Sequence, residues 1–209
     1  MKLKKFAKNI IYAGSLCLLA AFSISACQSG DDKDDSKPKS ETNHPRVEVE
    51  MENGDKFVIE LYPEYAPLTV DNFVELAKGG FYDGLVFHRI VNNFMAQGGG
   101  YDASDEKKEA KTIRGEFSNN GYSKNTLKHK KGVISMARIG GRNDSASSEF
   151  FIMLANKSGL DGDYAAFGEV IQGMEVIENF QQIERTLGFD GAISKPVEPL
   201  VIKKMTVLN

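Results

Sequence analysis

The sequence contains none of the motifs on which most enzyme chemistry depends. Its 209 residues include no GxSxG, P-loop, GxGxxG or HExxH segment, so a hydrolase, a nucleotide-dependent enzyme and a zinc enzyme are poorly supported. Only three histidines occur, and none has a second histidine or cysteine at metal-ligand spacing. His44 lies in a polar segment, and His88 and His129 are expected to be hydrogen-bonded core or loop residues. We therefore expect neither a metal nor a cofactor.

Strong charge of either sign is also missing. The chain has 26 Lys and Arg against 29 Asp and Glu, a formal net charge of −3. Beyond the first few residues there is no basic run, so a nucleic-acid partner is not expected. Hydrophobic residues at 41% and charged residues at 26% are typical of a globular protein.

The N-terminus has the order of an export signal. Residues 1–9, MKLKKFAKN, are positively charged, and residues 10–24 are apolar. This apolar stretch is short for a transmembrane helix of about 20 residues. The next segment, ISAC, ends at Cys27 and resembles a bacterial lipobox. We therefore expect residues 1–26 to be a lipoprotein signal peptide and Cys27 to carry the lipid; a plain signal peptide cleaved at the same point is the alternative.

Removal of residues 1–26 leaves Cys27 as the only cysteine of the mature chain, because Cys17 is lost. A disulfide, a CxxC motif and a thiolate metal site are then impossible. Residues 28–45, QSGDDKDDSKPKSETNHP, contain no large apolar side chain that could offset the entropy of ordering. We expect residues 27–45 to be a disordered tether that holds the protein outside the cytoplasm, anchored to the bacterial membrane through Cys27.

The remaining residues, 46–209, predict one mainly β domain. Pro67 begins a helix that ends at Gly79-Gly80, a second helix is expected over 174–183, and Asn53-Gly54 predicts a hairpin turn. The expected strands are VEVEM, KFVIELY, LVFHRIV, FMAQ, GVISMA, EFFIML, AAFGEV and LVIKKMTVL. Eight short strands and two helices favour a closed eight-stranded antiparallel barrel capped by two α-helices, since closure removes exposed strand edges.

Arg89 is the unusual residue of these strands, because an arginine rarely lies among apolar side chains without a partner. Alternation along LVFHRIV predicts Phe87 and Arg89 on one face and His88 on the other. The same rule places Phe94 with Ala96, and Met95 with Gln97. It also separates Phe150 from Phe151.

Several ordered blocks carry a resemblance to a known family. FHRI, FMAQGG, GVISMA, SSEFFI and LDGDYAAFGEV follow one another at compatible spacing, and RGEFSNNG and TLKHKKG lie between them. This pattern resembles the cyclophilin family of peptidyl-prolyl isomerases from about Val47 to the C-terminus. The resemblance implies an eight-stranded barrel with two helices, which agrees with the independent expectation.

Carried over residue by residue, the resemblance implies a catalytic role for Arg89 and Gln97. The substrate-binding positions that it implies are Phe87, Phe94, Met95, Ala137, Arg138, Glu149, Phe151, Leu160 and Tyr164. Rotation about an X–Pro bond meets a barrier of ~18–20 kcal/mol and transfers no proton. An apolar slot for the proline ring and a guanidinium that binds the proline carbonyl are therefore sufficient for catalysis. This would explain why Arg89 lies among apolar residues.

Three positions depart from the family pattern: Glu149, Arg138, and Gly159, which stands where many eukaryotic members have tryptophan. Glu149 stands where many members have glutamine, so it could pair with Arg89 and occupy it, or it could orient Arg89; we favour orientation. Arg138 replaces an asparagine that acts mainly through its backbone.

Three functions remain open at this point. The first is a monomeric prolyl isomerase that acts on proline-containing exported or unfolded polypeptides. The second is a non-catalytic chaperone or adhesin module that holds X–Pro segments on the cell surface. A solute-binding lipoprotein is the least favoured, because such proteins usually need two lobes.

Overall fold

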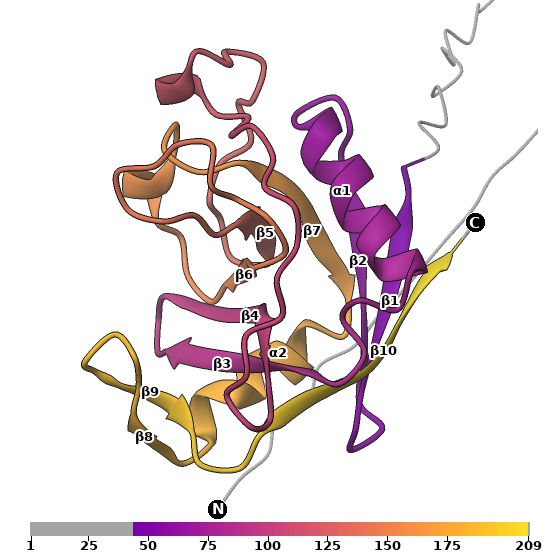
Figure 1. Cartoon of the computed structure of the whole chain (residues 1–209), viewed down its shortest axis with the longest axis vertical. Helices are drawn as coiled ribbons and strands as arrows, with labels where there is room; N and C mark the ends of the chain where they lie inside the picture. The colour runs from indigo at the N-terminus through magenta and orange to yellow at the C-terminus, as the bar shows by residue number, and fades with distance from the viewer. Residues whose placement is uncertain (1–43, 209) are drawn as a thin grey trace, which may run out of the picture. The chain divides into compact units, whose positions relative to one another are not determined.

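The computed structural model describes residues 44–208. Eight strands form a closed antiparallel barrel in the order β1-β10-β3-β4-β6-β5-β7-β2 (Figure 1). Their bounds are β1 Arg46–Met51, β2 Lys56–Leu61, β3 Leu85–Val91, β4 Met95–Asp102, β5 Val133–Met136, β6 Phe150–Met153, β7 Ala166–Gln172 and β10 Leu200–Leu208. The predicted fold class is confirmed. The predicted signal peptide, Cys27 and residues 28–43 of the tether lie outside the described residues.

Both predicted helices are present. The first, α1 (Pro67–Lys78), has proline in its first turn and ends at Gly79, and its buried side chains include Val70, Phe73 and Val74. The second, α2 (Met174–Asn179), is shorter than predicted because the chain continues as a 3₁₀ turn over Phe180–Gln182. In residues 44–208, neither helix is long and apolar enough to span a membrane.

The core fills the barrel with interlocking aromatic rings. Phe73 of α1 meets Tyr82, Phe150 and Phe167 at centroid distances of 5.2–5.5 Å, and Phe87 meets Phe150 edge-on at 5.7 Å. These five side chains are fully buried. The apolar face of α1 therefore packs on the inward-facing residues of strands from both halves of the sheet.

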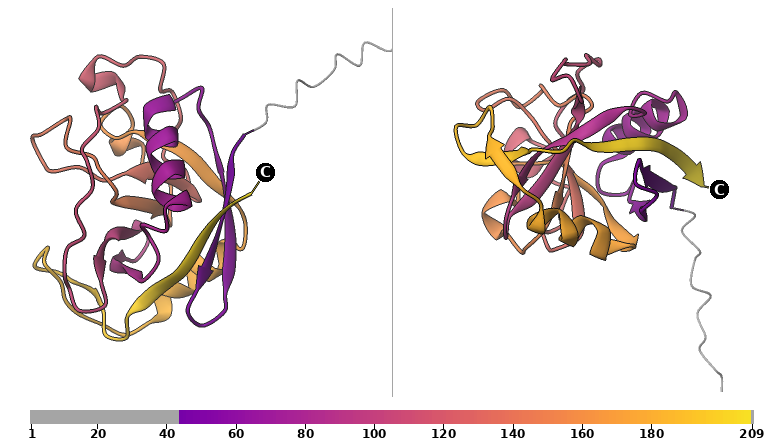
Figure 2. Two further views of the ribbon diagram at one scale, coloured as in Figure 1. Left: turned by 45° about the vertical axis from the view of Figure 1, so that its right-hand side comes forward. Right: turned by 90° about the horizontal axis from the view of Figure 1, so that it is seen from below.

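A second, two-stranded sheet was not predicted from the sequence. It consists of β8 (Arg185–Leu187) and β9 (Ile193–Pro196), joined by a short loop. All three views place this hairpin on the side of the barrel opposite the C-terminus (Figures 1 and 2). Short strands with exposed residues such as Leu187 and Ile193 leave little alternation to detect.

Two boundaries also differ from the expectation. His44 and Pro45, assigned to the tether, lie against β2: the Pro45 carbonyl accepts a hydrogen bond from Leu61 N at 2.9 Å, and the His44 ring packs on Tyr62. Strand β4 runs five residues past Gln97 into and beyond the glycine run, where a Cβ at Gly98 would lie 2.9 Å from the Val86 carbonyl oxygen. The glycines thus let β3 and β4 approach closely.

A buried carboxylate caps α1 in place of the usual side chain at the helix start. No side chain caps α1 from the N-cap position. Instead Glu116, 1% exposed, accepts hydrogen bonds from the backbone of Leu68 and Thr69 and from the Thr69 hydroxyl at 2.8–3.1 Å. The negative charge of Glu116 also interacts favourably with the positive, N-terminal end of the α1 helix dipole.

Replacing Glu116 by alanine is expected to lower the free energy of unfolding by about 3 kcal/mol, because it leaves buried donors unpaired. Urea denaturation measures this loss. Glu75→Ala on the exposed side of α1 serves as the control and should change stability by less than about 0.5 kcal/mol. A Glu116 variant as stable as this control contradicts the capping role.

Candidate active site

The candidate site is a row of residues that crosses four neighbouring strands. Arg89 of β3 pairs with Gln97 of β4, Gln97 pairs with Phe151 of β6, and Phe151 pairs with Ser135 of β5. Residues paired across antiparallel strands share one face of a sheet. The barrel wall therefore brings together side chains that are up to 62 positions apart in the sequence.

One extra residue in β3 turns Arg89 to the outer face. Phe87 pairs with Gly98 and Arg89 pairs with Gln97, so two steps along β3 correspond to one step along β4. His88 is the extra residue of this bulge, and a bulge shifts the alternation of the side chains. Phe87 consequently points into the core while Arg89 faces outward.

The predicted face assignments fail at this bulge and at one turn. Phe87 and Arg89 do not share a face, and Phe87, fully buried in the core, is outside the hollow, so its predicted contact with substrate is wrong. Phe94 lies in the turn before β4, after Asn93 with φ 55°, and does not share a face with Ala96. The separation of Phe150 from Phe151 is confirmed.

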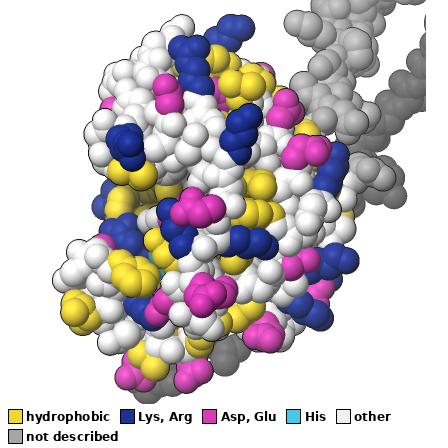
Figure 3. Space-filling view, viewed as in Figure 1, with side chains coloured by type: hydrophobic (Ala, Val, Ile, Leu, Met, Phe, Trp, Pro, Cys, Tyr) yellow, Lys and Arg dark blue, Asp and Glu magenta, His cyan; other side chains and the backbone are white. Residues whose placement is uncertain are grey.

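A hollow of about 290 Å³ lies over this row. Figure 3 shows it at the left edge of the molecule, with hydrophobic side chains inside it and basic ones beside it. Nine of the predicted site residues line it: Arg89, Phe94, Met95, Gln97, Ala137, Arg138, Phe151, Leu160 and Tyr164. Their roles remain predictions, but the structure brings all nine together.

The floor of the hollow is apolar and braced from behind. Met95 and Phe151 pack together in a small cluster of their own, separate from the barrel core. The Phe151 ring lies parallel to the His129 ring at 6.0 Å and meets the Tyr164 ring edge-on at 5.6 Å. This is a shaped slot for a small apolar ring.

The rim of the hollow is formed by Arg138 and Tyr164. The Arg138 guanidinium lies 4.9 Å from the centre of the Tyr164 ring, and its Nε donates to the Asp163 carbonyl at 2.9 Å. The neighbouring Ala137 N donates to the Glu149 carbonyl at 2.9 Å. The side chain of Arg138 thus stiffens the rim, a role beyond the backbone contact expected there.

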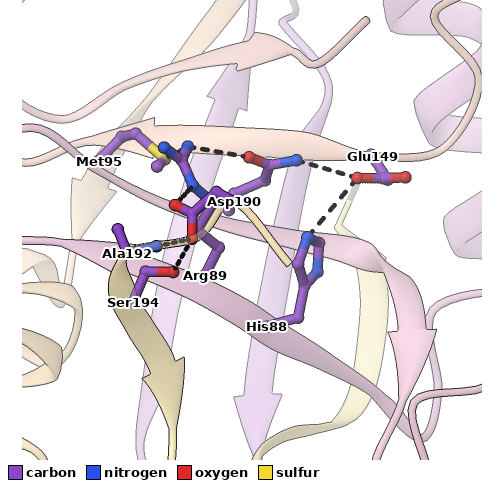
Figure 4. A network of polar contacts seen from close by, with 8 residues as sticks. His88, Arg89, Met95, Glu149, Asp190, Ala192 and Ser194 are labelled. Carbon is purple, nitrogen blue, oxygen red and sulfur yellow. Dashed lines mark hydrogen bonds and ion pairs between the residues drawn. The ribbon is translucent and has the colours of Figure 1, made fainter. Parts of the chain in front are cut away.

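Arg89 is bound to a carboxylate that the sequence did not predict. Its Nε donates to Asp190 Oδ2 at 2.6 Å, while Nη1 lies 3.4 Å from Gln97 Oε1 and 3.8 Å from Met95 Sδ (Figure 4). Asp190 is 101 positions away, in the β8–β9 loop, and nothing in its local sequence, GFDG, indicates an arginine partner. Burial pushes the pKa of Asp190 upward, but hydrogen bonds from Arg89, Ser194 and Ala192 outweigh it and hold the pKa at about 2.

Glu149 does not contact Arg89, so the pair that would occupy the arginine is absent, and the orienting role stays a prediction. Its Oε2 accepts a hydrogen bond from Gln97 Nε2 at 2.9 Å and lies 3.6 Å from His88 Nε2 (Figure 4). Gly100 makes room for it, because a Cβ there would lie 2.4 Å from Glu149 Cγ. Glu149 therefore acts on Arg89 only through Gln97.

His129, Asp161 and Ser135 have the arrangement of a hydrolase triad without its access. His129 Nδ1 lies 3.0 Å from Asp161 Oδ1, and Nε2 lies 3.1 Å from Ser135 Oγ. Ser135 is fully buried and His129 is 2% exposed, so no substrate can reach the hydroxyl. The trio fixes the His129 ring behind Phe151, and the predicted hydrogen-bonded histidine is confirmed here.

His88 is buried without full hydrogen bonding, so the same prediction is wrong for it. Its Nδ1 has no hydrogen-bond partner within residues 44–208, and its ring meets Tyr101 edge-on at 4.8 Å. Burial, together with the positive charge of Arg89, lowers the pKa of His88 to about 4. Across residues 44–208, no group of three or more His, Cys, Asp or Glu residues is placed to hold a metal ion.

The sequence was compared with models of known protein families. Residues 46–207 match the model described as "Cyclophilin type peptidyl-prolyl cis-trans isomerase/CLD". The chain belongs to the cyclophilin family. The match covers the whole described barrel, which includes every residue that lines the hollow.

Curated peptidyl-prolyl cis-trans isomerases of bacteria and yeast are similar to this chain over most of their length. A peptidyl-prolyl cis-trans isomerase of Acinetobacter baylyi is 41% identical over 169 residues, 77% of this chain and 86% of that protein. One of Schizosaccharomyces pombe is 38% identical over 162 residues, 78% and 98% of the two chains. A crystal structure of a cyclophilin-type isomerase of Cryptosporidium parvum superposes with a TM-score of 0.67 at 24% identity, covering 79% and 98%, which shows the fold.

The burial of His88 predicts how the stability of this cyclophilin depends on pH. Its pKa falls from 6.5 in the unfolded chain to about 4 in the folded protein, so the folded state binds fewer protons between these values. Stability is therefore complete above pH 6.5 and falls as the pH drops toward 4, by about 3 kcal/mol from this group. Burial lowers the pKa of His129 as well, which acts in the same direction.

Urea denaturation of wild type and His88→Gln between pH 7 and pH 4 measures the contribution. The variant is expected to lose about 3 kcal/mol less than wild type over this range. Parallel pH profiles for the two proteins contradict the assignment.

Proposed function

We propose that this cyclophilin accelerates cis-trans rotation about X–Pro bonds, with Arg89 as the group that polarises the prolyl amide. The observation that carries the proposal is the hollow itself, an apolar slot with a guanidinium at its edge. The family match and the names of the curated relatives support the reaction. The arrangement of the side chains supports the mechanism.

The reaction asks little of the protein beyond position and charge. The barrier to rotation, ~18–20 kcal/mol, comes from amide resonance, and no bond is broken. The proline ring binds between Met95 and Phe151, where it displaces water. The terminal nitrogens of Arg89 donate to the carbonyl of the proline residue. They can also donate to the amide nitrogen of the X–Pro bond as it becomes pyramidal, and this contact weakens the amide resonance.

Preorganisation is the reason that this charge is effective. The Arg89 side chain is 30% exposed, so its donors act in a partly desolvated place where aligned charges count for more than in water. Gln97 lies between Arg89 and Glu149 and has both amide ends bound. This fixes which way its carbonyl oxygen faces and gives Arg89 a constant neighbour during rotation.

A module that holds X–Pro segments without turning them over is the second candidate. The same slot supports it, and so does the Asp190 carboxylate on Arg89, since a neutralised guanidinium polarises an amide less. The monodentate contact favours the enzyme, because it engages Nε and leaves Nη2 without a hydrogen bond within residues 44–208.

We extend the proposal to an exported, lipid-anchored protein with exported or unfolded proline-containing polypeptides as substrates. The charged and apolar segments of residues 1–26 and the ISAC segment at Cys27 support it. Arg46 pairs with Leu208 at the end of β10, so the barrel begins beside its C-terminus. The hairpin next to Arg89 is on the opposite side of the barrel (Figure 2). A monomer suffices for this chemistry.

Replacing Arg89 by alanine is expected to lower the enzyme-catalysed exchange rate of an X–Pro peptide by about 10²–10³. The affinity for the peptide should stay within about threefold, because the apolar slot supplies most of the ground-state binding. Exchange spectroscopy by NMR measures the rate, and a titration of the peptide measures the affinity.

Lys128→Ala, a change of an exposed cation that pairs with Asp161, is the matched control and should leave the rate within about twofold. Equal rates for Arg89→Ala and wild type contradict the arginine mechanism. A wild type that binds peptide without accelerating exchange favours the holding module.

Glu149→Gln is expected to change the catalysed rate by no more than about threefold, because its carboxylate reaches Gln97 and not Arg89. The same exchange measurement checks it. A rise of tenfold or more indicates that the carboxylate suppresses Arg89, and a fall of that size indicates that it is essential for orientation.

A further inference from the structure

The carboxylate on Arg89 is fixed by its own hairpin before it meets the arginine. Asp190 Oδ1 accepts hydrogen bonds from the Ser194 hydroxyl at 2.7 Å and from Ala192 N at 3.1 Å. The other oxygen, Oδ2, is the one that accepts from Arg89 Nε. Figure 4 shows this carboxylate between the Ser194 hydroxyl and the guanidinium. Its direction is thus set independently of Arg89.

The hairpin tip is in turn attached to the end of β4. On one side of Asp190, the Phe189 ring packs on the Tyr101 ring at 5.5 Å with 30° between the planes. On the other side, Lys195 forms an ion pair with Asp105. Phe189 remains 71% exposed, so its contact with Tyr101 is an anchoring contact at the surface. Two attachments that flank Asp190 hold the loop over Arg89.

The contact with Asp190 fixes the orientation of the Arg89 guanidinium and leaves its terminal nitrogens available at the hollow. Asp190 engages only Nε, Nη1 has a long contact with Gln97 at 3.4 Å, and Nη2 makes no hydrogen bond within residues 44–208. A bidentate pair with a carboxylate would have occupied a terminal nitrogen as well. The plane of the guanidinium is therefore set while terminal donors stay available at the hollow.

Two effects of Asp190 oppose each other. Its negative charge weakens the positive potential of Arg89, and its hydrogen bond orders a long, flexible side chain. The side chains of Arg89 and Asp190 are 30% and 22% exposed, so water screens the charge effect only in part. The contact at Nε leaves the terminal nitrogens of Arg89 without a carboxylate partner in residues 44–208, so we take orientation as the stronger effect.

We propose that Asp190 is a positioning residue, which holds Arg89 in the orientation that reaches the prolyl carbonyl. The inference rests on the proposed isomerase function and adds to it a residue from outside the hollow. The pKa of about 2 supports it, because Asp190 then stays ionised at every pH at which the enzyme is assayed. The β8–β9 hairpin thereby becomes part of the catalytic apparatus.

A pair of substitutions separates orientation from charge. Asp190→Ala removes both and is expected to lower the catalysed exchange rate about tenfold, with peptide affinity within about twofold of wild type. Asp190→Asn removes the charge but keeps an oxygen that can accept from Nε, and it should retain a rate within about threefold. If Asp190 acted through its charge, Asp190→Asn would not retain the rate that Asp190→Ala loses.

The resonance of the Arg89 Nε proton gives a readout that does not depend on activity. In wild type and Asp190→Asn it should be resolved and slow to exchange with water, and in Asp190→Ala it should broaden or disappear. Glu169→Ala is the matched control, because Glu169 also accepts a 2.6 Å hydrogen bond, from the hydroxyl of Tyr62, the residue after β2. It should change neither the rate nor the Arg89 signal.

Asp190→Ala with a rate equal to or above that of wild type overturns the proposal and makes Asp190 neutral or inhibitory. An unchanged Arg89 signal in Asp190→Ala also overturns it, because the carboxylate then holds nothing. If wild type itself fails to accelerate exchange, the proposed function fails. In that case the Arg89 signal still decides whether Asp190 orders the guanidinium, since its loss in Asp190→Ala supports that part and its retention refutes it.

Discussion

The bulge at His88 is the constraint on which the candidate site depends. One additional residue in β3 lets Phe87 fill the barrel while Arg89, two positions later, faces the outer surface. A regular strand would have placed both on one face, with a guanidinium in the aromatic core or a phenyl ring in solvent. The bulge also leaves His88 buried with an Nδ1 that has no hydrogen-bond partner among residues 44–208, which is a cost in stability. This loss of stability occurs next to Arg89, where the bulge is needed to turn the arginine outward.

From Arg89 the polar contacts run in two directions. On one side lie Asp190 and the hairpin that carries it; on the other lie Gln97 and Glu149. Both ends of this chain are carboxylates, whereas Arg89 and Gln97 in its middle line the hollow. The apolar floor is separately braced by His129 behind Phe151. The two halves of the site, one that grips a ring and one that polarises an amide, thus have independent supports, which suits a reaction that requires geometry and not proton transfer.

The barrel was predictable because it follows local rules: alternating segments with turn residues between them predicted the eight strands. The residues of the hollow came from the family resemblance, and nine of the residues that it implied line one hollow. Alternation failed at Phe87, because a bulge leaves no mark in one sequence, and at Phe94, which lies in a turn. Asp190 was missed for a different reason: the contact joins residues 101 positions apart, and the hairpin that makes it is too short to have a pattern.

The most direct test of the central claim is an exchange spectrum of a short Ala-Pro peptide with catalytic amounts of wild type labelled at its methionine methyl groups. We expect cis-trans exchange peaks within a second, against tens of seconds for the free peptide, together with a shift of the Met95 methyl resonance. A shifted Met95 resonance without exchange peaks would contradict the isomerase function, because the hollow would then bind proline without accelerating its rotation.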